Sequence, residues 1–312
     1  MDRSEQFFDL LQGPGSPLSR DELIELKDRY QIIFLKGLMG DLVPDRVNSY
    51  FLDQMQWLQQ HEISYWRPES NSDYGMQKLS RNNIGAIERT ILNRHQMYPD
   101  KDVILVSHSK GGIDALETLL ARNYLPGTHV RGWIAMQTPF SGTPISDWVI
   151  RNRLLNPVTQ SLLAGPFKGD RNVALNMGTQ ARVDYIRRNA AAIQALAKKC
   201  NILSFASRIS SADRSIFRPL RYALDRICDL ANDGLIPTES HVLSIDGIPS
   251  CPWVEANHID HIYTVLPVFP DRGSNDRLSH KHRRIRIFAS LLKIWMNNRS
   301  NQTSLNWKTM LN

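Results

Sequence analysis

The side chain whose type and position are best suited to chemistry is Ser109, which lies in the segment VILVSHSKGG at residues 103–112. A continuous apolar run precedes it, and two glycines and a set of apolar residues at helical spacing follow it. This pattern predicts a sharp turn from a buried strand into a helix, with the serine at the corner. A hydroxyl held out at that corner lies at the carboxyl edge of a sheet and at a helix N-terminus, where developing negative charge is stabilised. The pattern favours a nucleophile; the alternative is a glycine turn whose serine only caps the helix.

A serine nucleophile also needs hydrogen-bond donors for the oxyanion that forms when it attacks a carbonyl group. The backbone amide of Lys110, directly after Ser109, is one predicted donor. The second is expected in the loop after an earlier strand. The segment FLKGLMG at residues 34–40 fits that place, because Gly37 allows a tight reversal that directs the amide of Leu38 toward the hydroxyl. An ordinary glycine turn is the alternative for this loop.

Two histidines are candidates for the base that takes the serine proton. His258 and His261 both lie in EANHIDHIYTV at residues 255–265. A pair of packed or surface histidines is the plain alternative. Metal ligation by His258, Asp260 and His261 is a weaker one, because no further cluster of ligand types accompanies them.

The base in turn needs a carboxylate that orients it, and this acid is expected between the serine and the histidine in the chain. Asp233 lies in such a place, in the turn NDG before an apolar pair. An NDG segment is also a common structural turn. Pattern alone leaves three rivals open, namely Asp213, Asp225 and Asp229.

These segments together resemble the α/β-hydrolase superfamily, especially its bacterial lipase-like branch. The resemblance covers about residues 31–265 in five segments that follow the family order. They are IIFLKGLMG (32–40, oxyanion strand and loop), VILVSHSKGG (103–112, nucleophile elbow), IAMQTPFSGTPISDW (134–148), NDGLIPTES (232–240, acid turn) and NHID (257–260, histidine turn). The ordered set is more specific than any one of its members.

The resemblance implies that Ser109 is the nucleophile, Asp233 the orienting acid and His258 the base. It also implies that the amides of Leu38 and Lys110 form the oxyanion hole. The family's histidine turn has an acidic residue two positions after the base. NHID fits that description, so His258 is placed ahead of the other candidate.

The sequence departs from the family at two lysines. Lys36 stands where the family usually has a histidine before the oxyanion glycine, which removes a side chain that supports the loop. Lys110 follows the nucleophile where an apolar residue is more usual. Its ammonium group is expected to reach solvent or to favour an anionic acyl substrate.

The elements that must position these residues alternate along the chain. Apolar runs at 31–35, 62–66, 103–107, 130–136 and 201–207 predict strands, and helical patterns lie between them. This alternation predicts an α/β fold with a mostly parallel sheet covered by helices. Residues 241–245 are a candidate last strand. A closing helix is expected around residues 285–295.

The predicted domain of this type spans residues 29–298. Residues 1–28 are expected to be a peripheral lead-in, and residues 299–312 a polar C-terminal tail. The alternation of strand and helix patterns stops after residue 136. This interruption predicts a helical cap inserted at about 141–199. Its apolar residues suit an acyl chain or the core; they are Trp148, Leu154, Leu155, Leu162, Leu163 and Phe167.

The composition and the charge pattern limit the classes of partner that the protein is expected to bind. The 312 residues contain 42% hydrophobic and 22% charged residues, as in ordinary globular proteins, and the net charge is +7. Basic residues are spread along the chain except for KHRRIR at 281–286. This argues against a nucleic-acid binder and leaves either a solvated helix face or contact with an anionic membrane or an acidic partner. The sequence does not specify an oligomeric state.

The chain shows no signal peptide and no run of apolar residues long enough to span a membrane, so a cytoplasmic location is expected. Three widely spaced cysteines predict reduced thiols. The predicted activity is hydrolysis of small-molecule or lipid carboxylic esters through an acyl-enzyme, with no metal and no organic cofactor. Thioesterase, peptidase and acyltransferase activities use the same residues and stay open. A binding protein of this fold without turnover is the alternative from another class.

Overall fold

The computed structural model describes residues 1–38, 50–67, 79–151, 171–213, 215, 217–266 and 277–310. Its centre is a six-stranded sheet in the order β2-β1-β3-β4-β5-β8, and every pairing in it is parallel. The strands are β1 (Tyr30–Leu35), β2 (Ser64–Trp66), β3 (Asp102–His108), β4 (Val130–Met136), β5 (Asn201–Arg208) and β8 (Trp253–Asn257). The predicted fold class, a mostly parallel α/β sheet flanked by helices, is confirmed.

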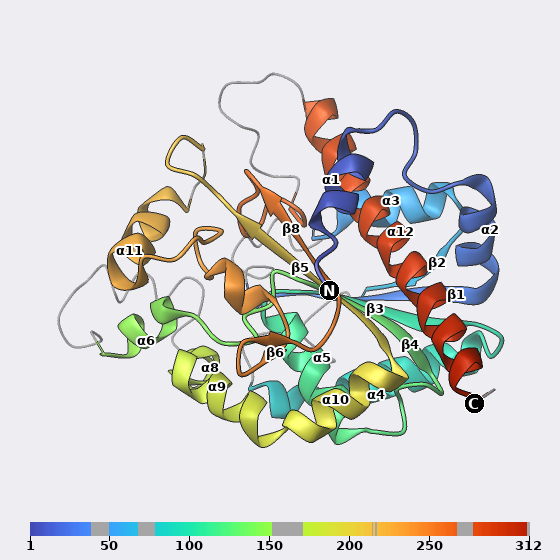
Figure 1. The fold of residues 1–312 in the computed structure, drawn as a ribbon, viewed down its shortest axis with the longest axis horizontal. Coiled ribbons are helices and arrows are strands. Elements are labelled where there is room, and N and C mark those ends of the chain that lie inside the picture. The colour runs from blue at the N-terminus through green and yellow to red at the C-terminus, as the bar shows by residue number, and fades with distance from the viewer. Residues whose placement is uncertain are drawn as a thin grey trace.

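Helices cover both faces of the sheet (Figure 1). One face carries α4 (Ser80–Met97), α5 (Lys110–Ala121) and α10 (Ala190–Lys199). The other carries α1 (Ser4–Gln12), α2 (Arg20–Arg29), α3 (Leu52–Gln60) and the long α12 (Arg277–Met310). Strands β1, β3 and β4 are buried on both faces, which explains why they read as continuous apolar runs in the sequence.

The register of the sheet brings the predicted chemistry to one edge. Leu35 at the end of β1 pairs with Ser107, and His108 at the end of β3 pairs with Met136 at the end of β4. Parallel strands end at the same edge, so the residues that follow β1, β3 and β4 emerge side by side. Lys36, Ser109 and Gln137 are those residues.

Three buried side chains anchor the first 28 residues to the rest of the molecule, although most of these residues are exposed or half-buried. Phe7, Leu18 and Leu26 are buried in the larger apolar core, which they share with α12. The chain start also pairs with β8, because the amide of Arg3 donates to the carbonyl of Trp253 at 2.8 Å. At the other end, α12 continues to Met310 through the residues expected to form a separate tail.

The last strand of the sheet differs from the expectation. Residues 241–245 do not join the main sheet: they contain the end of a short 3-10 helix (Thr238–His241) and β6 (Ser244–Ile245), which pairs with β7 (Ile248–Pro249). The sixth strand is β8. Only Val254 and Ala256 of β8 are buried, so this edge strand lacks the long apolar run that marks the central ones.

Between β4 and β5 the structure describes α6 (Pro144–Arg151), α8 (Arg171–Met177), α9 (Thr179–Arg188) and α10. Helix α10 contacts α5 and β5 and therefore flanks the sheet. Five of the six apolar residues predicted for the cap fall in residues 152–170, outside the described residues. Trp148 on α6 is described and packs against a small apolar cluster next to the sheet edge.

Two further features bear on the environment of the protein. Within the described ranges, no helix combines the length and the apolar character that a membrane crossing requires. All three cysteines are free thiols: Cys200 and Cys251 are buried, whereas Cys228 is half-buried. Burial raises the pKa of the Cys200 thiol to about 12 and that of Cys251 to about 11, which keeps both protonated.

Candidate active site

Ser109 occupies a strained corner between β3 and α5. Its φ of 54° and ψ of −129° are rare for a residue other than glycine. Two glycines permit the close packing around it. A Cβ on Gly37 would lie 2.6 Å from the Ser109 Cβ, and a Cβ on Gly111 would lie 2.5 Å from the carbonyl oxygen of Leu35. The corner therefore has the form expected of a nucleophile elbow, although Ser109 is more enclosed than expected, with 3% of its surface exposed.

The imidazole that meets the serine belongs to His261. Its Nε2 lies 2.9 Å from the Ser109 Oγ, and its Nδ1 lies 2.6 Å from Oδ2 of Asp233. The amide of His261 also donates to the backbone carbonyl of Asp233 at 3.1 Å. The ring is 1% exposed, so it is held in one orientation by two polar contacts and by its own backbone.

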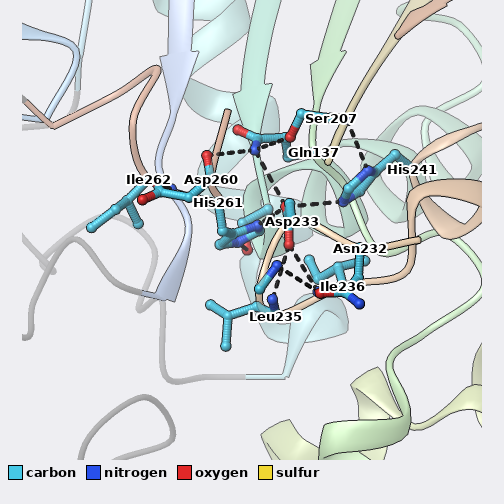
Figure 2. A network of polar contacts seen from close by, with 12 residues as sticks. Gln137, Ser207, Asn232, Asp233, Leu235, Ile236, His241, Asp260, His261 and Ile262 are labelled. Carbon is cyan, nitrogen blue, oxygen red and sulfur yellow. Dashed lines mark hydrogen bonds and ion pairs between the residues drawn. The ribbon is translucent and has the colours of Figure 1, made fainter. Parts of the chain in front are cut away.

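Asp233 is the centre of the polar network in Figure 2. Its Oδ1 accepts the amides of Leu235 and Ile236 at 3.0 and 2.9 Å, which forms the turn that the NDG segment predicted. Its Oδ2 faces the His261 ring. Burial alone would raise the pKa of this carboxyl group, but the two neighbouring histidines, His261 and His241, outweigh burial and hold the pKa well below its usual range. Asp233 is therefore a carboxylate at neutral pH.

A second imidazole points at the same carboxylate (Figure 2). The Nε2 of His241 lies 3.2 Å from Oδ2 of Asp233, and its Nδ1 accepts the amide of Ser207 at 3.4 Å. The side chains of Asp233, His241 and His261 together have the donor types of a metal site, with ligand atoms within 4.8 Å of one another. His261, however, hydrogen-bonds this oxygen, whereas Nε2 of His241 lies 3.2 Å from it as an ion-pair contact without hydrogen-bond geometry, and each ring has a partner on its other nitrogen. This arrangement fits one acid held by two imidazoles.

The preference for His258 as the base does not agree with the geometry. His258 follows β8 directly with a φ of 60°, which turns its ring outward. The side chain is 63% exposed, and its Nδ1 lies 2.8 Å from Oδ1 of Asp213. His258 and Asp213 thus form their own surface pair. The sequence named both histidines as candidates, but the structure brings His261 to Ser109.

The acidic residue in NHID has a different role from the one that selected His258. Asp260 accepts the amides of Ile262 and Tyr263 at 3.1 and 2.9 Å and the hydroxyl of Ser215 at 2.8 Å. Its carboxyl group is buried, and burial raises its pKa. Asp260 therefore caps the turn that begins at His261. It precedes the residue in contact with Ser109, whereas the family pattern places the acid after the base.

A chain of hydrogen bonds that the sequence did not reveal connects the loop after β1 to the backbone of His261. The amide of Gly37 donates to the Tyr50 hydroxyl at 3.1 Å, and that hydroxyl contacts Nδ1 of His108. The Nε2 of His108 lies 2.7 Å from the backbone carbonyl of His261. Burial and the nearby His261 lower the pKa of His108 well below its usual value. A neutral ring accepts from Tyr50 and donates to the carbonyl, which ties Gly37 to the His261 loop.

Gln137 is the second support of this loop. Its amide nitrogen lies 2.9 Å from the carbonyl of Asp260 and 2.6 Å from the Ser207 hydroxyl, as Figure 2 shows. Its amide oxygen accepts the Thr264 hydroxyl at 3.0 Å. One glutamine after β4 therefore holds both ends of the turn around His261. It lies in the quoted segment 134–148 directly after a central strand, but the sequence analysis gave it no role.

The Lys110 side chain neither reaches solvent nor points toward a substrate. Its Nζ is buried and lies 2.7 and 2.9 Å from the two carboxylate oxygens of Asp114, one turn along α5. Asn83 on α4 donates to the same carboxylate at 3.0 Å. The buried ion pair of Lys110 with Asp114 thus stabilises the first turn of α5. Both expectations for its ammonium group were wrong because pairing within one helix turn provides a buried partner.

The predicted oxyanion donors lie on either side of the serine. Lys110 is the first residue of α5, and amides in the first turn of a helix have no carbonyl partner within that helix. Leu38 follows Gly37, at which an added Cβ would lie 2.6 Å from the Ser109 Cβ. The Leu38 side chain is buried in an apolar cluster with Ile113 of α5 and residues of α6, α8 and α11 (Arg218–Cys228).

The segment after β4 supports the acid turn. Thr143 donates its hydroxyl to the carbonyl of Leu235 at 2.6 Å, and the amide of Phe140 donates to the carbonyl of Ser240 at 2.8 Å. The later acid of this segment, Asp147, accepts the amide of Thr179 at the start of α9. The third segment of the resemblance therefore packs against the middle and the end of NDGLIPTES.

Comparisons with known proteins were made by sequence and by structure. No family model matches the chain, and no curated protein matches it. Solved structures do match. The metagenomic carboxyl esterase MGS0156 aligns with a TM-score of 0.64 and 18% identity over 87% of this chain and 76% of its own length. The mature form of the lipase BlEst2 from Bacillus licheniformis aligns with a TM-score of 0.60 and 17% identity over 75% of this chain and 85% of its own.

These similarities concern the fold. At 17–18% identity they carry no residue role to this chain, but they span most of the sheet and its helices. They agree with the parallel sheet and the helices that flank it. The α/β-hydrolase-like esterase and lipase fold, stated above as a resemblance, is thereby confirmed.

Proposed function

Proceeding from this α/β-hydrolase fold, we propose that the protein is a serine hydrolase of carboxylic esters that uses Ser109, His261 and Asp233. The observation that carries the proposal is the continuous line from the Ser109 Oγ to His261 Nε2 and from His261 Nδ1 to Asp233, with contacts of 2.9 and 2.6 Å. A hydroxyl is a weak nucleophile unless a positioned base takes its proton. Here the serine, the base and the orienting acid come from three distant parts of the chain, after β3, after β8 and before the 3-10 helix.

In the proposed reaction, His261 takes the Ser109 proton as Oγ attacks the ester carbonyl carbon. The imidazolium that forms is stabilised by Asp233, which burial and two hydrogen bonds from backbone amides keep in place. The amides of Leu38 and Lys110 stabilise the oxyanion. His261 then protonates the leaving alcohol as the tetrahedral intermediate collapses, and an acyl-enzyme remains. Water, deprotonated by the same ring, releases the carboxylic acid.

The substrate class follows from the surroundings of the serine. Leu38, which follows Gly37, and Ile113, in the first turn of α5, belong to one apolar cluster that continues onto α6 and α8. An apolar acyl group fits this side of the site better than a charged one, because the only ammonium group in the first turn of α5 is paired with Asp114. The solved structures with a similar fold are a carboxyl esterase and a lipase by their names, which agrees with an ester substrate.

The test combines active-site labelling with turnover. A fluorophosphonate probe should label the wild type and fail to label Ser109→Ala. p-Nitrophenyl esters from acetate to dodecanoate should be cleaved by the wild type and not by Ser109→Ala. Absence of both labelling and cleavage in the folded wild type would contradict the proposal and favour a binding protein. Labelling of Ser109→Ala equal to that of wild type would exclude Ser109 as the nucleophile.

A further inference from the structure

A groove lies between α1 and α12, away from Ser109. Figure 1 shows α1 beside α12 and β8, and residue contacts join α1 to both. The groove has a volume of about 840 Å³, which falls in the range of pockets that hold small molecules. Its apolar lining comes from α1, the following loop, α3, β8 and α12 and consists of Phe7, Phe8, Leu11, Pro17, Trp57, Ala256, Ile285 and Ala289. Phe8 is 54% exposed, an unusual position for a large apolar ring.

Basic side chains of α12 line the same groove. They belong to KHRRIR, the basic run that the proposed function does not use. Two members of this run serve the fold, since Arg284 is buried against Asp53 and Lys281 bonds Gln56. His282, Arg283 and Arg286 line the groove instead.

The arginines that line the groove are not paired with the acidic residue that also lines it. In the part of the chain that the structure describes, neither Arg283 nor Arg286 has a carboxylate within 4 Å. Arg286 donates to the backbone carbonyls of Leu10 in α1 and Gly15 in the following loop, and Arg283 lies over the ring of Tyr263. The lining acid, Glu255, is paired with Arg208. An apolar concavity with uncompensated arginines is complementary to a ligand that has an apolar body and an anionic head.

We propose that this groove binds a single-chain lipid with an anionic head group, with the chain along Phe8, Leu11 and Ile285 and the head group near His282 and Arg283. A groove of this volume has room for one acyl chain. The inference does not depend on the proposed esterase function, because the groove lies on the face of the sheet that α12 covers and shares no residue with the Ser109 site.

The experiment uses photoactivatable dodecanoate, with a diazirine near its methyl end, at a concentration below micelle formation. After irradiation of the full chain, peptide mapping identifies the labelled segments. We expect labelling in residues 4–17 or 282–289, and competition by unlabelled dodecanoate at least about tenfold stronger than by dodecanol, because the head-group charge contributes. Two matched pairs of surface variants test the contacts. Arg283→Glu and Phe8→Ser should each reduce labelling about tenfold or more, whereas Arg89→Glu on α4 and Ile24→Ser on α2 should not.

Each other outcome contradicts the proposal. Labelling confined to peptides around Ser109 would place the lipid in the ester site alone. Equal competition by dodecanol, or equal labelling of Arg283→Glu, would show that the basic side chains do not select the ligand. Binding to anionic vesicles without labelling by monomeric dodecanoate would indicate a membrane-contact surface in place of a lipid site. Ester hydrolysis by the same samples reports on the Ser109 site separately, so the two proposals fail independently.

Discussion

The two ends of the turn after β8 carry histidines in opposite surroundings. His261 is 1% exposed and contacts a serine and an aspartate, whereas His258, three residues earlier, is 63% exposed and contacts a surface aspartate. Both rings have a carboxylate partner at a similar distance, 2.6 Å for His261 and 2.8 Å for His258. The comparison teaches that a histidine-aspartate pair alone does not identify a base. What distinguishes His261 is that its second nitrogen reaches a nucleophile.

The backbone of this turn explains the difference. His258 has a positive φ, and the amide of the next residue, Ile259, donates to the carbonyl of Arg208 on β5. Ile259 and Ile262 are buried and anchor the turn to the core. Asp260 caps the segment that follows. These contacts direct His258 to the surface and His261 to the carboxyl edge of the sheet.

The test with the largest expected effect replaces each of the two histidines separately by alanine. His261→Ala should lower kcat/KM for a soluble p-nitrophenyl ester by about 10⁴ or more, because the serine loses its base. His258→Ala should change it by less than about threefold, since surface substitutions away from the site have small effects. Steady-state kinetics on the purified variants measure both values. A larger loss in His258→Ala than in His261→Ala, with both proteins folded, would reverse the assignment.

The acids give the second test. Asp233→Asn should lower kcat by about 10⁴, because an amide no longer holds the His261 tautomer that accepts the serine proton. Asp213→Asn is the matched control and should keep kcat within about threefold, because its partner is the exposed His258. Pre-steady-state labelling by a fluorophosphonate should slow in the same order. Equal effects of the two substitutions would mean that Asp233 is only a structural turn residue.

The sequence predicted the strands and turns that carry the site better than it predicted the side-chain contacts within the site. Strands β1, β3 and β4 were found because they are buried on both faces, and Ser109 and Asp233 were named from local turns that the structure contains. The preference for His258 does not match the contacts, in which His261 meets Ser109, because a short pattern cannot show which way a turn directs its side chains. His108 and Gln137 lie in quoted segments and Tyr50 and His241 outside them, but the contacts of all four could not be predicted, since they join segments that lie far apart in the chain.

The third test addresses the chain of hydrogen bonds that supports the His261 side of the comparison. Tyr50→Phe removes the hydroxyl that accepts the Gly37 amide and contacts His108. We expect kcat to fall by about 10- to 100-fold with little change in KM, because small displacements of positioned groups have effects of this size. A structural role alone would lower stability without this split between kcat and KM. Tyr65→Phe, at a half-buried tyrosine on edge strand β2, is the control and should leave kcat unchanged.

The smallest expected effect is a pH dependence of stability that originates at His108. Burial and the nearby His261 lower the pKa of His108 in the folded protein, whereas in the unfolded chain it titrates near 6.5. Below about pH 6.5 the unfolded chain therefore binds a proton that the folded protein does not, so the free energy of unfolding falls as pH decreases. One such group contributes at most about 1.4 kcal/mol per pH unit.

Urea unfolding of the wild type and His108→Gln between pH 5 and 7.5 measures this contribution. The difference in slope between the two proteins isolates His108 from other groups, such as the half-buried His129, whose pKa is lowered in the same direction. We expect the wild type to lose more stability than the variant as pH decreases. Parallel slopes would mean that His108 takes up its proton in the folded state. The ring would then not accept from Tyr50, and His261 would lose the tie to the Gly37 loop that distinguishes it from His258.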